Sequence, residues 1–416
     1  WQQNGDLMAA RLGVKITFRK IAVKAFDEPR PYPIPRQLMT TTWQEVVNDP
    51  QIQVLIELVG GTGIAKTMVL AALAQGKTVV TANKALVSAH GPELFAAAAK
   101  SGANLYYEAS VCGGIPIIKA LREGLTANRI QWIAGIINGT TNFILSEMRD
   151  KGLPFAEVLK EAQRLGYAEA DPTFDIEGID AAHKLTIMSA IAFGIPMQFD
   201  KAYIEGISKL EAVDIKYAEQ LGYRIKLLGI TKRKDNGIEL RVHPTLVPTK
   251  CLIANVEGAM NAVLVQGDAV GASLYYGKGA GAEPTASAVI ADLVDVTRLH
   301  TVDPEHRVPH LAFRPDALSD ITILPQSEVE TRYYLRLAVS DKPGVLADIT
   351  RILADRQISI EAMLQREPNE GEQQADIIML THLTREKHID AAIMLIEALP
   401  VVKSKVIRLR LEELDK

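Results

Sequence analysis

Three short apolar runs separated by helical segments constrain the fold of this chain more than any other feature. The runs are residues 54–61, 78–84 and 104–110, and we expect helices from residue 64 to 75 and from Pro92 to about Gly102. Strands that alternate with helices of this length favour a parallel, doubly wound sheet. Ligands of such sheets gather beyond the carboxyl ends of the strands, where residues 59–62 and 83–84 fall.

Residues 14–24 predict a further, ragged strand ahead of a proline-rich loop at 29–37. A dinucleotide-binding unit opens with a strand, a Gly-x-Gly-x-x-Gly turn and a helix, a pattern that Gly5 and Gly13 do not supply. We therefore expect the sequence to begin after the first strand and turn of such a unit. Lys24 follows the next strand, where an acid commonly binds the ribose hydroxyl. A base there favours NADP over NAD, unless Lys24 is an ordinary surface lysine.

Residues 166–184, GYAEADPTFDIEGIDAAHK, concentrate negative charge ahead of an almost wholly apolar helix that we expect to begin near Ile179. The carboxylates suit a substrate with an ammonium group, and they are Glu169, Asp171, Asp175, Glu177 and Asp180. Asp180 and Lys184 share one helical stripe with Ile187 and Ile191. A buried lysine must be paired, and it is then a candidate proton donor.

The same pattern has a purely structural interpretation of similar weight. Acids in a first helical turn complement the helix dipole, Asp171 before Pro172 resembles a cap, and an acid and a lysine four residues apart commonly support a helix.

Composition narrows the functional class. With 416 residues, 45.4 kDa and 48% hydrophobic residues, the chain has room for two or three domains. A net charge of -4 with mixed signs offers no basic face for nucleic acid. The sequence shows neither a bilayer-length apolar run nor a signal segment. The cysteines are Cys112 and Cys251, which favour a reducing, cytoplasmic setting over a disulfide framework.

Residues 333–413 predict the order strand, helix, strand, strand, helix, strand, which is a ferredoxin-like arrangement. With the sequence DKPGVL at 341–346, this region resembles an ACT domain. The helix beginning at Gly344 could receive the carboxylate of a threonine-like effector on its backbone N–H groups. The alternative is a dimerisation module without a ligand. ACT domains usually pair, so we expect a homo-oligomer in either case.

Two further segments carry a second resemblance. The sequence AEADP at 168–172, followed by Asp175, Gly178, Asp180 and Lys184, resembles the signature of homoserine dehydrogenases, and VVTANKAL at 79–86 is similar to the segment with that family's active-site lysine. The resemblance implies reversible NAD(P)-dependent reduction of L-aspartate 4-semialdehyde to L-homoserine, a step in threonine, methionine and isoleucine biosynthesis.

The resemblance also implies roles for individual residues. Lys184 would protonate the developing alkoxide, Lys84 would hold the substrate and stabilise charge, and Asp180 would act with them. Substrate-binding residues would be Glu169, Asp175 and Asp180. Cofactor-binding residues would be Thr62, Lys84, Gly166 and Gly281 with the neighbouring Gly279. The position of Lys24 after its predicted strand adds Lys24 to them. A monovalent cation, most simply sodium, would be held by Glu108 and the carbonyls of Val111, Gly113 and Ile115.

NGTTNFIL at 138–145 would position these groups; its alternative is a helix start capped at Thr140 or Thr141. The expected α/β architecture is a nucleotide-binding domain (1–115), an α+β substrate and dimerisation domain (116–305, with 277–305 returning to the first), a linker (306–332) and the ACT domain (333–416). Two other functions stay open. One is an amino-acid-binding regulatory protein with a vestigial dehydrogenase domain, and the other is a dehydrogenase of this architecture acting on another amino-acid aldehyde.

Overall fold

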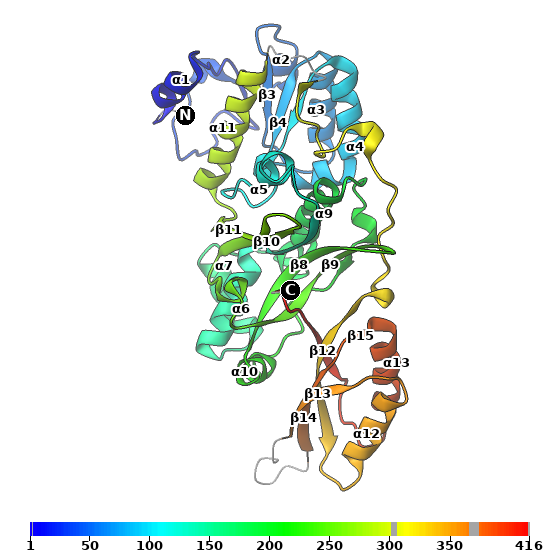
Figure 1. The fold of residues 1–416 in the computed structure, drawn as a ribbon. Helices are drawn as coiled ribbons and strands as arrows, with labels where there is room; N and C mark the ends of the chain where they lie inside the picture. Colours follow the sequence, from blue (N-terminus) through cyan, green and yellow to red (C-terminus); the bar gives the residue numbers. More distant parts are fainter. Residues whose placement is uncertain (2, 301–305, 366–373, 415–416) are drawn as a thin grey trace. The chain divides into compact units, whose positions relative to one another are not determined.

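A computed structural model describes residues 1, 3–300, 306–365 and 374–414 (Figure 1). Residues 301–305, the end of the expected return segment, lie outside this part. The chain forms two compact units. The first comprises Trp1–Arg129, Thr186–Phe199 and Gly277–Asp320, and the second comprises Ile130–Leu185, Asp200–Tyr276 and Ile321–Lys416. Helix α9 (Ile179–Phe193) contributes residues to both units.

The first unit contains the parallel sheet that the alternating pattern predicts. Strands β3 (Val54–Glu57), β4 (Thr78–Thr81) and β5 (Leu105–Tyr106) lie in the order β3-β4-β5, all parallel. Helix α11 (Ala282–Leu299) packs on one face, and α3 (Ile64–Ala74) and α4 (Lys84–Ser101) lie on the other (Figure 1). Further helices of this unit are α1 (Gly5–Leu12), α2 (Trp43–Val47) and α5 (Ile117–Lys119).

Several expected boundaries were wrong. Helix α4 begins at Lys84 rather than Pro92, because the Asn83 side chain accepts a hydrogen bond from the Leu86 N–H at 3.1 Å and caps the helix. Pro92 lies inside this helix, where it lacks the N–H that would bond the turn before it. The strand expected at 104–110 ends at Tyr106 and gives way to a 3-10 turn at Glu108–Ser110.

The ragged strand expected at 14–24 is reduced to β1 (Ile21–Ala22), which pairs in parallel with β2 (Met39–Thr40). The residues before β1 are held by ion pairs between side chains and not by strand pairing. Lys20 Nζ lies 2.9 Å from Glu45 Oε2, and Arg19 Nε lies 3.4 Å from Asp49 Oδ2.

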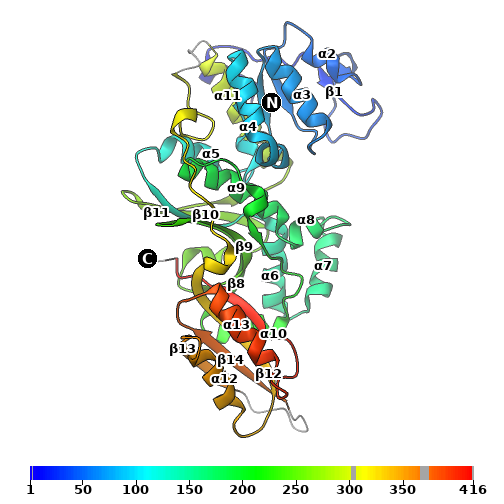
Figure 2. The same cartoon turned by 90° about the vertical axis from the view of Figure 1, so that its right-hand side faces the viewer.

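The second unit is built, in its described part, on an 11-stranded sheet. Nine of its strands lie in the order β11-β10-β6-β8-β9-β16-β12-β14-β13, and the other two are β7, which pairs with β9, and β15, which pairs with β12. A long antiparallel hairpin of β8 (Tyr223–Lys234) and β9 (Gly237–Pro248) forms its centre. The strands before the ACT region are β6 (Ile130–Ile136), β7 (Tyr203–Ile204), β10 (Met260–Gly267) and β11 (Gly271–Lys278). Helices α6 (Gly139–Lys151) and α7 (Phe155–Arg164) lie to one side of the hairpin (Figure 2), and α8 (Thr173–Ile176) and α10 (Ala212–Gln220) complete this part.

The C-terminal region has the predicted ferredoxin-like order. Its elements are β12 (Glu330–Ser340), α12 (Val345–Ala354), β13 (Ile360–Gln365), β14 (Gln374–Thr381), β15 (Thr384–Arg385), α13 (Glu386–Glu397) and β16 (Ile407–Leu411). Both helices pack on one face of the strands, where Tyr333, Leu335, Ile349 and Ile389 are buried together. Strand β16 is shorter than the expected 401–411, because residues 401–406 form no continuous ladder and Val402 makes only an isolated bridge with Val339. It pairs with β12 and also, in parallel, with β9.

None of the helices in the described ranges is long and apolar enough to cross a membrane. Cys112 and Cys251 are both buried.

Candidate active site

The second unit brings Lys184 and Asp180 into a buried ion pair at the end of β6. Lys184 Nζ donates to Asp180 Oδ2 at 2.7 Å and to the backbone carbonyl of Ile137 at 2.8 Å. The two side chains are only 10% and 5% exposed. A buried ammonium is stable only with such compensation, so its position is fixed by the acceptors around it.

Asn138 joins this pair to a second carboxylate. Its Nδ2 donates to Asp175 Oδ1 at 2.7 Å and to Asp180 Oδ2 at 2.9 Å. Its Oδ1 accepts the Thr141 N–H at 2.9 Å, so Asn138, rather than Thr140 or Thr141, caps helix α6. One side chain therefore starts a helix and holds both carboxylates in place.

The electrostatics of the cluster favour a cation. Burial raises the pKa of Asp175 above its usual range and the Asp180 charge raises it further, while hydrogen bonds from Asn138 and Thr140 oppose the shift. Two carboxylates beside one ammonium leave net negative charge in a mostly buried place. A ligand ammonium group bound there would relieve the repulsion between the carboxylates.

The acidic loop that carries these groups is tightly folded. The Thr173 N–H donates to Asp171 Oδ1 at 3.1 Å and opens the short helix α8. Gly178 has φ +81°, and a Cβ there would lie 3.1 Å from Val242 Cγ1, which explains the glycine. Glu169 lies earlier in the loop and is exposed, and its backbone carbonyl accepts a bond from Gln163. The structure thus places Asp175, Asp180 and Lys184 together, with Glu169 at the loop surface.

In the first unit, the carboxyl ends of β3 and β4 are fixed by one buried carboxylate. Glu57 accepts the N–H groups of Val59 at 2.7 Å and Gly60 at 3.0 Å, and the Thr81 hydroxyl at 2.6 Å. Asn83 Nδ2 donates to the Gly61 carbonyl at 2.7 Å. The glycine loop and the start of α4 are therefore held side by side at the edge where parallel sheets bind ligands.

Thr62 and Lys84 lie at this edge. Thr62 is exposed in the glycine loop, and Lys84 is the first residue of α4, next to the capping Asn83. The same edge exposes large apolar side chains: Leu58 is 61% exposed, Val59 60% and Ile64 49%. An apolar surface beside glycine N–H groups fits the flat rings and phosphates of a dinucleotide.

The predicted cation segment forms a buried turn. Val111, Cys112 and Ile115 are at most 2% exposed, and Cys112 has a left-handed φ of 54°. The Glu108 carboxylate accepts backbone N–H groups of Ile118 at 2.9 Å and Lys119 at 2.7 Å.

Asp292, which the sequence did not single out, lies next to Glu108 and accepts its backbone N–H at 2.9 Å. Burial raises the pKa of each carboxyl to about 7, and for Glu108 the Asp292 charge adds to the effect. Two buried acids beside carbonyl oxygens fit a hard monovalent cation in charge and donor type. Both Glu108 oxygens accept backbone N–H groups, and the Ile115 carbonyl accepts the Ile117 N–H at 2.7 Å.

Glycines bring this turn against a second one. The Gly114 N–H donates to the Lys278 carbonyl at 2.9 Å, and a Cβ on Gly113 would lie 2.9 Å from the Gly279 carbonyl oxygen. Gly281, with φ +115°, precedes helix α11. Of the other expected cofactor residues, Lys24 is exposed two residues after β1 in the first unit, and Gly166 is exposed after α7 in the second unit, with φ +77°.

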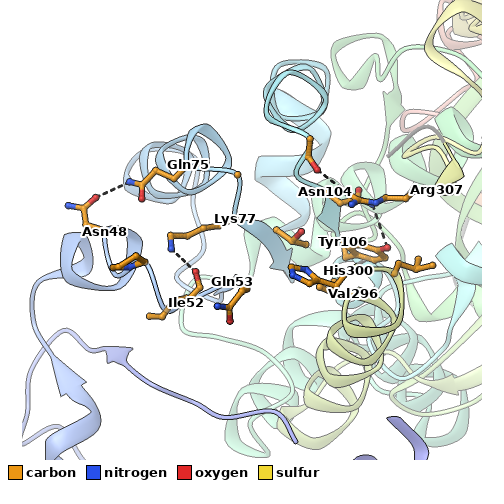
Figure 3. Close-up of a pocket in the computed structure, with 15 residues that line it drawn as sticks. Asn48, Ile52, Gln53, Gln75, Lys77, Asn104, Tyr106, Val296, His300 and Arg307 are labelled. Carbon is orange, nitrogen blue, oxygen red and sulfur yellow. Dashed lines mark hydrogen bonds between the residues drawn. The ribbon is translucent and has the colours of Figure 1, made fainter. Parts of the chain in front are cut away.

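A cavity of about 470 Å³ lies elsewhere in the first unit (Figure 3). It is lined at the amino ends of the strands, by Gln53, Thr78 and Asn104, and its Lys77 donates to the backbone carbonyl of Ile52. Ligands of parallel sheets bind at the opposite edge, so this cavity is not the cofactor site.

Sequence reasoning assigned Asn138 and Thr140 to a positioning segment but not to the site itself, and it missed Asp292 and the hydrogen bonds of Glu57 and Asn83 that hold the first unit's loop. An Asn-Gly-Thr directly after a strand was the available signal for Asn138. Asp292 sits in an ordinary amphipathic helix, which gives no such signal.

Comparison with protein families gives three matches along the chain. A family described as homoserine dehydrogenase matches residues 116–294, the NAD-binding domain of homoserine dehydrogenase matches 3–108, and the ACT domain matches 333–401.

Several individual proteins match over nearly the whole chain. The homoserine dehydrogenase of Pseudomonas aeruginosa is 57% identical and covers 100% of this chain and 95% of its own length, and that of Neisseria gonorrhoeae is 55% identical, with 99% and 94% covered. The crystal structure of a homoserine dehydrogenase from Thiobacillus denitrificans is 64% identical, with a TM-score of 0.93 over 99% of this chain and 94% of its own. A hyperthermophilic archaeal homoserine dehydrogenase in complex with NADPH is 28% identical, with a TM-score of 0.55 over 63% of this chain and 76% of its own.

Proposed function

The chain belongs to the homoserine dehydrogenase family, and we propose how its residues carry out the NAD(P)-dependent interconversion of L-aspartate 4-semialdehyde and L-homoserine. The observation that carries the proposal is the buried Asp180–Lys184 pair tied through Asn138 to Asp175. An intact acid and base cluster also favours an enzyme over a sensor with a vestigial dehydrogenase domain.

Lys184 is the proton donor in this proposal. Asp180 and the Ile137 carbonyl hold its ammonium in one place, so it can deliver a proton to the alkoxide as that charge develops. Asp175 and Asp180, with Glu169 from the loop surface, bind the substrate ammonium. The nicotinamide cofactor, when bound, supplies the hydride. Lys84 and Thr62 hold substrate and cofactor at the carboxyl edge of the first unit's sheet.

Replacing Lys184 tests the assignment. We expect Lys184→Met to lower kcat by about 10²–10⁴-fold, the usual contribution of a positioned general acid, while cofactor binding stays near the wild-type level. Lys226 provides a matched control, since it is 1% exposed and donates to the Val256 carbonyl at 2.6 Å in the same unit. Lys226→Met should lower stability but not the chemical step. Turnover of Lys184→Met within tenfold of wild type would exclude it as the donor.

The cofactor preference is NADP in this proposal, with NAD as the weaker cofactor. Lys24 supports it, because an exposed base just after β1 suits a ribose phosphate better than a free hydroxyl. Gly166, Gly279 and Gly281 would complete the cofactor contacts. A larger increase of KM for NADPH than for NADH in Lys24→Ala is the expected result.

A monovalent cation, most simply sodium, would occupy the turn of Val111, Gly113 and Ile115 beside Glu108. The buried pair of Glu108 and Asp292 supports this, because a cation would neutralise their charge. A higher melting temperature in sodium chloride than in choline chloride at equal ionic strength would be its signature.

The ACT domain would bind a threonine-like amino acid at the start of α12, near Gly344, and would support a homo-oligomer in the cytoplasm. Its ferredoxin-like fold and the left-handed Gly344 before α12 support the site. Inhibition by threonine together with a larger species in size-exclusion chromatography is the expected observation.

A further inference from the structure

A buried arginine of the ACT domain reaches beyond that domain. Arg410, in β16, is fully buried and makes two hydrogen bonds to Glu386 at the start of α13, one of them from Nε to Oε2 at 2.8 Å. Its remaining N–H groups donate to residues outside the ACT domain. Nη1 donates to Glu205 Oε2 at 2.8 Å, and Nη2 donates to the Tyr203 hydroxyl at 2.9 Å.

Tyr203 and Glu205 together form a rigid binding site for the Arg410 guanidinium. The Tyr203 hydroxyl donates to Glu205 Oε2 at 2.6 Å, and the Arg410 guanidinium carbon lies 4.7 Å from the centre of the Tyr203 ring. The Glu205 N–H donates to the Val242 carbonyl at 2.8 Å, which extends the pairing of β7 with β9. Backbone, ring and carboxylate are thus all fixed.

The residues that follow Glu205 contact the acidic loop directly. The Ile207 N–H donates to the Ile176 carbonyl at 2.8 Å. Gly206 lies so close that an added Cβ would be 2.4 Å from the same carbonyl oxygen and 2.5 Å from Glu177 Cα. Ile176 and Glu177 stand between Asp175 and Asp180, so a displacement of residues 205–207 displaces the loop that carries both carboxylates.

We propose that Glu205 is a positioning residue for substrate binding, which the ACT-domain Arg410 holds so that residues 206–207 fix the acidic loop. The inference rests on the proposed roles of Asp175 and Asp180. It adds that the ACT domain supplies a contact on which the substrate site depends.

Glu205 is a suitable residue to change. Its side chain is 32% exposed, and Arg410 keeps its pairing with Glu386 when the Glu205 charge is removed. Glu205→Gln therefore weakens the hold on the loop without leaving the buried guanidinium unpaired. Tyr203→Phe keeps the ring and removes the hydroxyl, so it perturbs the same binding site for Arg410 through a different residue.

Steady-state kinetics in the direction of homoserine oxidation test the proposal. We expect Glu205→Gln and Tyr203→Phe each to raise KM for homoserine by about tenfold, while KM for the dinucleotide changes less than twofold. The two effects should not be additive in the double variant, because both substitutions loosen one contact.

Asp214→Asn is the matched control. Asp214 is fully buried on α10 and accepts Arg336 Nε of β12 at 2.6 Å, so it joins the ACT domain to a helix away from the acidic loop. This variant should lower the melting temperature and leave KM for homoserine unchanged.

Two failures are distinguishable. An unchanged KM for homoserine in Glu205→Gln overturns the positioning role, as does an equal rise in Asp214→Asn. An unchanged KM in Asp175→Asn, measured in parallel, would instead contradict the proposed substrate site.

Discussion

For single residues, the protonation state of a buried ionisable group in this protein is set by the groups that contact it. His243 on β9 is fully buried, and Arg241 Nη1 lies 2.7 Å from its Nε2. A guanidinium can only donate, so this ring nitrogen must accept and the imidazole must be neutral. Burial lowers the pKa of His243 well below its usual value, and the Arg410 and Arg241 charges act in the same direction.

This neutral histidine predicts a pH dependence of stability. Below pH of about 6.5 the unfolded state binds a proton at His243 and the folded state does not, so stability falls as the pH falls, by about 1.4 kcal/mol per pH unit. His243→Gln should remove this contribution, which urea denaturation between pH 5 and 7.5 measures. His382 is exposed, so His382→Gln is the control and should keep the wild-type slope. Parallel slopes in wild type and His243→Gln would contradict the assignment.

At the element scale, the positions of glycines are explained by contacts between segments that are far apart in sequence. A Cβ on Gly114 would lie 2.7 Å from the Lys278 carbonyl oxygen and 3.1 Å from Pro284 Cβ. Lys278 is the last residue of β11, and Pro284 lies in the first turn of α11. Residues 113–114 can therefore lie this close to residues 277–281 only because no side chain stands between the two backbones.

Gly114→Ala should separate these two turns. Because the nearest atom is backbone, the contact cannot relax by a rotamer change, and we expect a loss of about 1–3 kcal/mol in the free energy of unfolding. Gly124 is the matched control in the same unit, since an added Cβ there meets no atom within 4 Å. Gly124→Ala should be neutral or stabilising by up to about 1 kcal/mol. Equal melting temperatures for the two variants would show that the turns are not in contact.

The local sequence pattern predicted which helices and strands form. It was less successful at predicting where they begin and end and which distant residues they contact. The strands at residues 54 and 78 and helix α9 were predicted from short-range hydrophobic periodicity, which burial on a sheet or in a core enforces. The start of α4 was missed because a single side chain, Asn83, decides it. The stripe of Asp180 and Lys184 was visible at four-residue spacing, whereas the link from Asp175 through Asn138 depends on tertiary contact.

Across the whole second unit, the ACT strands and strands β6 to β11 belong to one hydrogen-bonded sheet. Strand β16 pairs with β12 inside the ACT domain and with β9 outside it, with Arg410 opposite Thr245 and Leu411 opposite Leu246. The predicted ACT domain at residues 333–416 included no strand pairing outside that domain. The sequence of β16 gives no sign of this second pairing, because either neighbour would suit the same alternation of residues.

This continuity predicts that the ACT domain and strands β6 to β11 unfold together. Glu412, 4% exposed after β16, accepts Arg241 Nη2 of β9 at 2.5 Å, and the Arg241 and Lys232 charges hold the pKa of Glu412 near 2 despite its burial. Glu412→Gln leaves the buried Arg241 with only half of the negative charge that pairs with it. We expect the free energy of unfolding to fall by about 3–5 kcal/mol. Hydrogen exchange should then rise in peptides of both β9 and β14.

The control for this prediction is Asp390→Asn, which removes a carboxylate from an ion pair with Arg408 on the ACT surface, where Asp390 is 51% exposed. Its cost should stay within about 1 kcal/mol, because solvent screens the pair. If Glu412→Gln increased exchange in the ACT peptides alone, the domain would be an independent module. A joint increase would mean that the ACT domain is part of the scaffold that holds the substrate site, so any ligand that changes its packing acts on the same sheet.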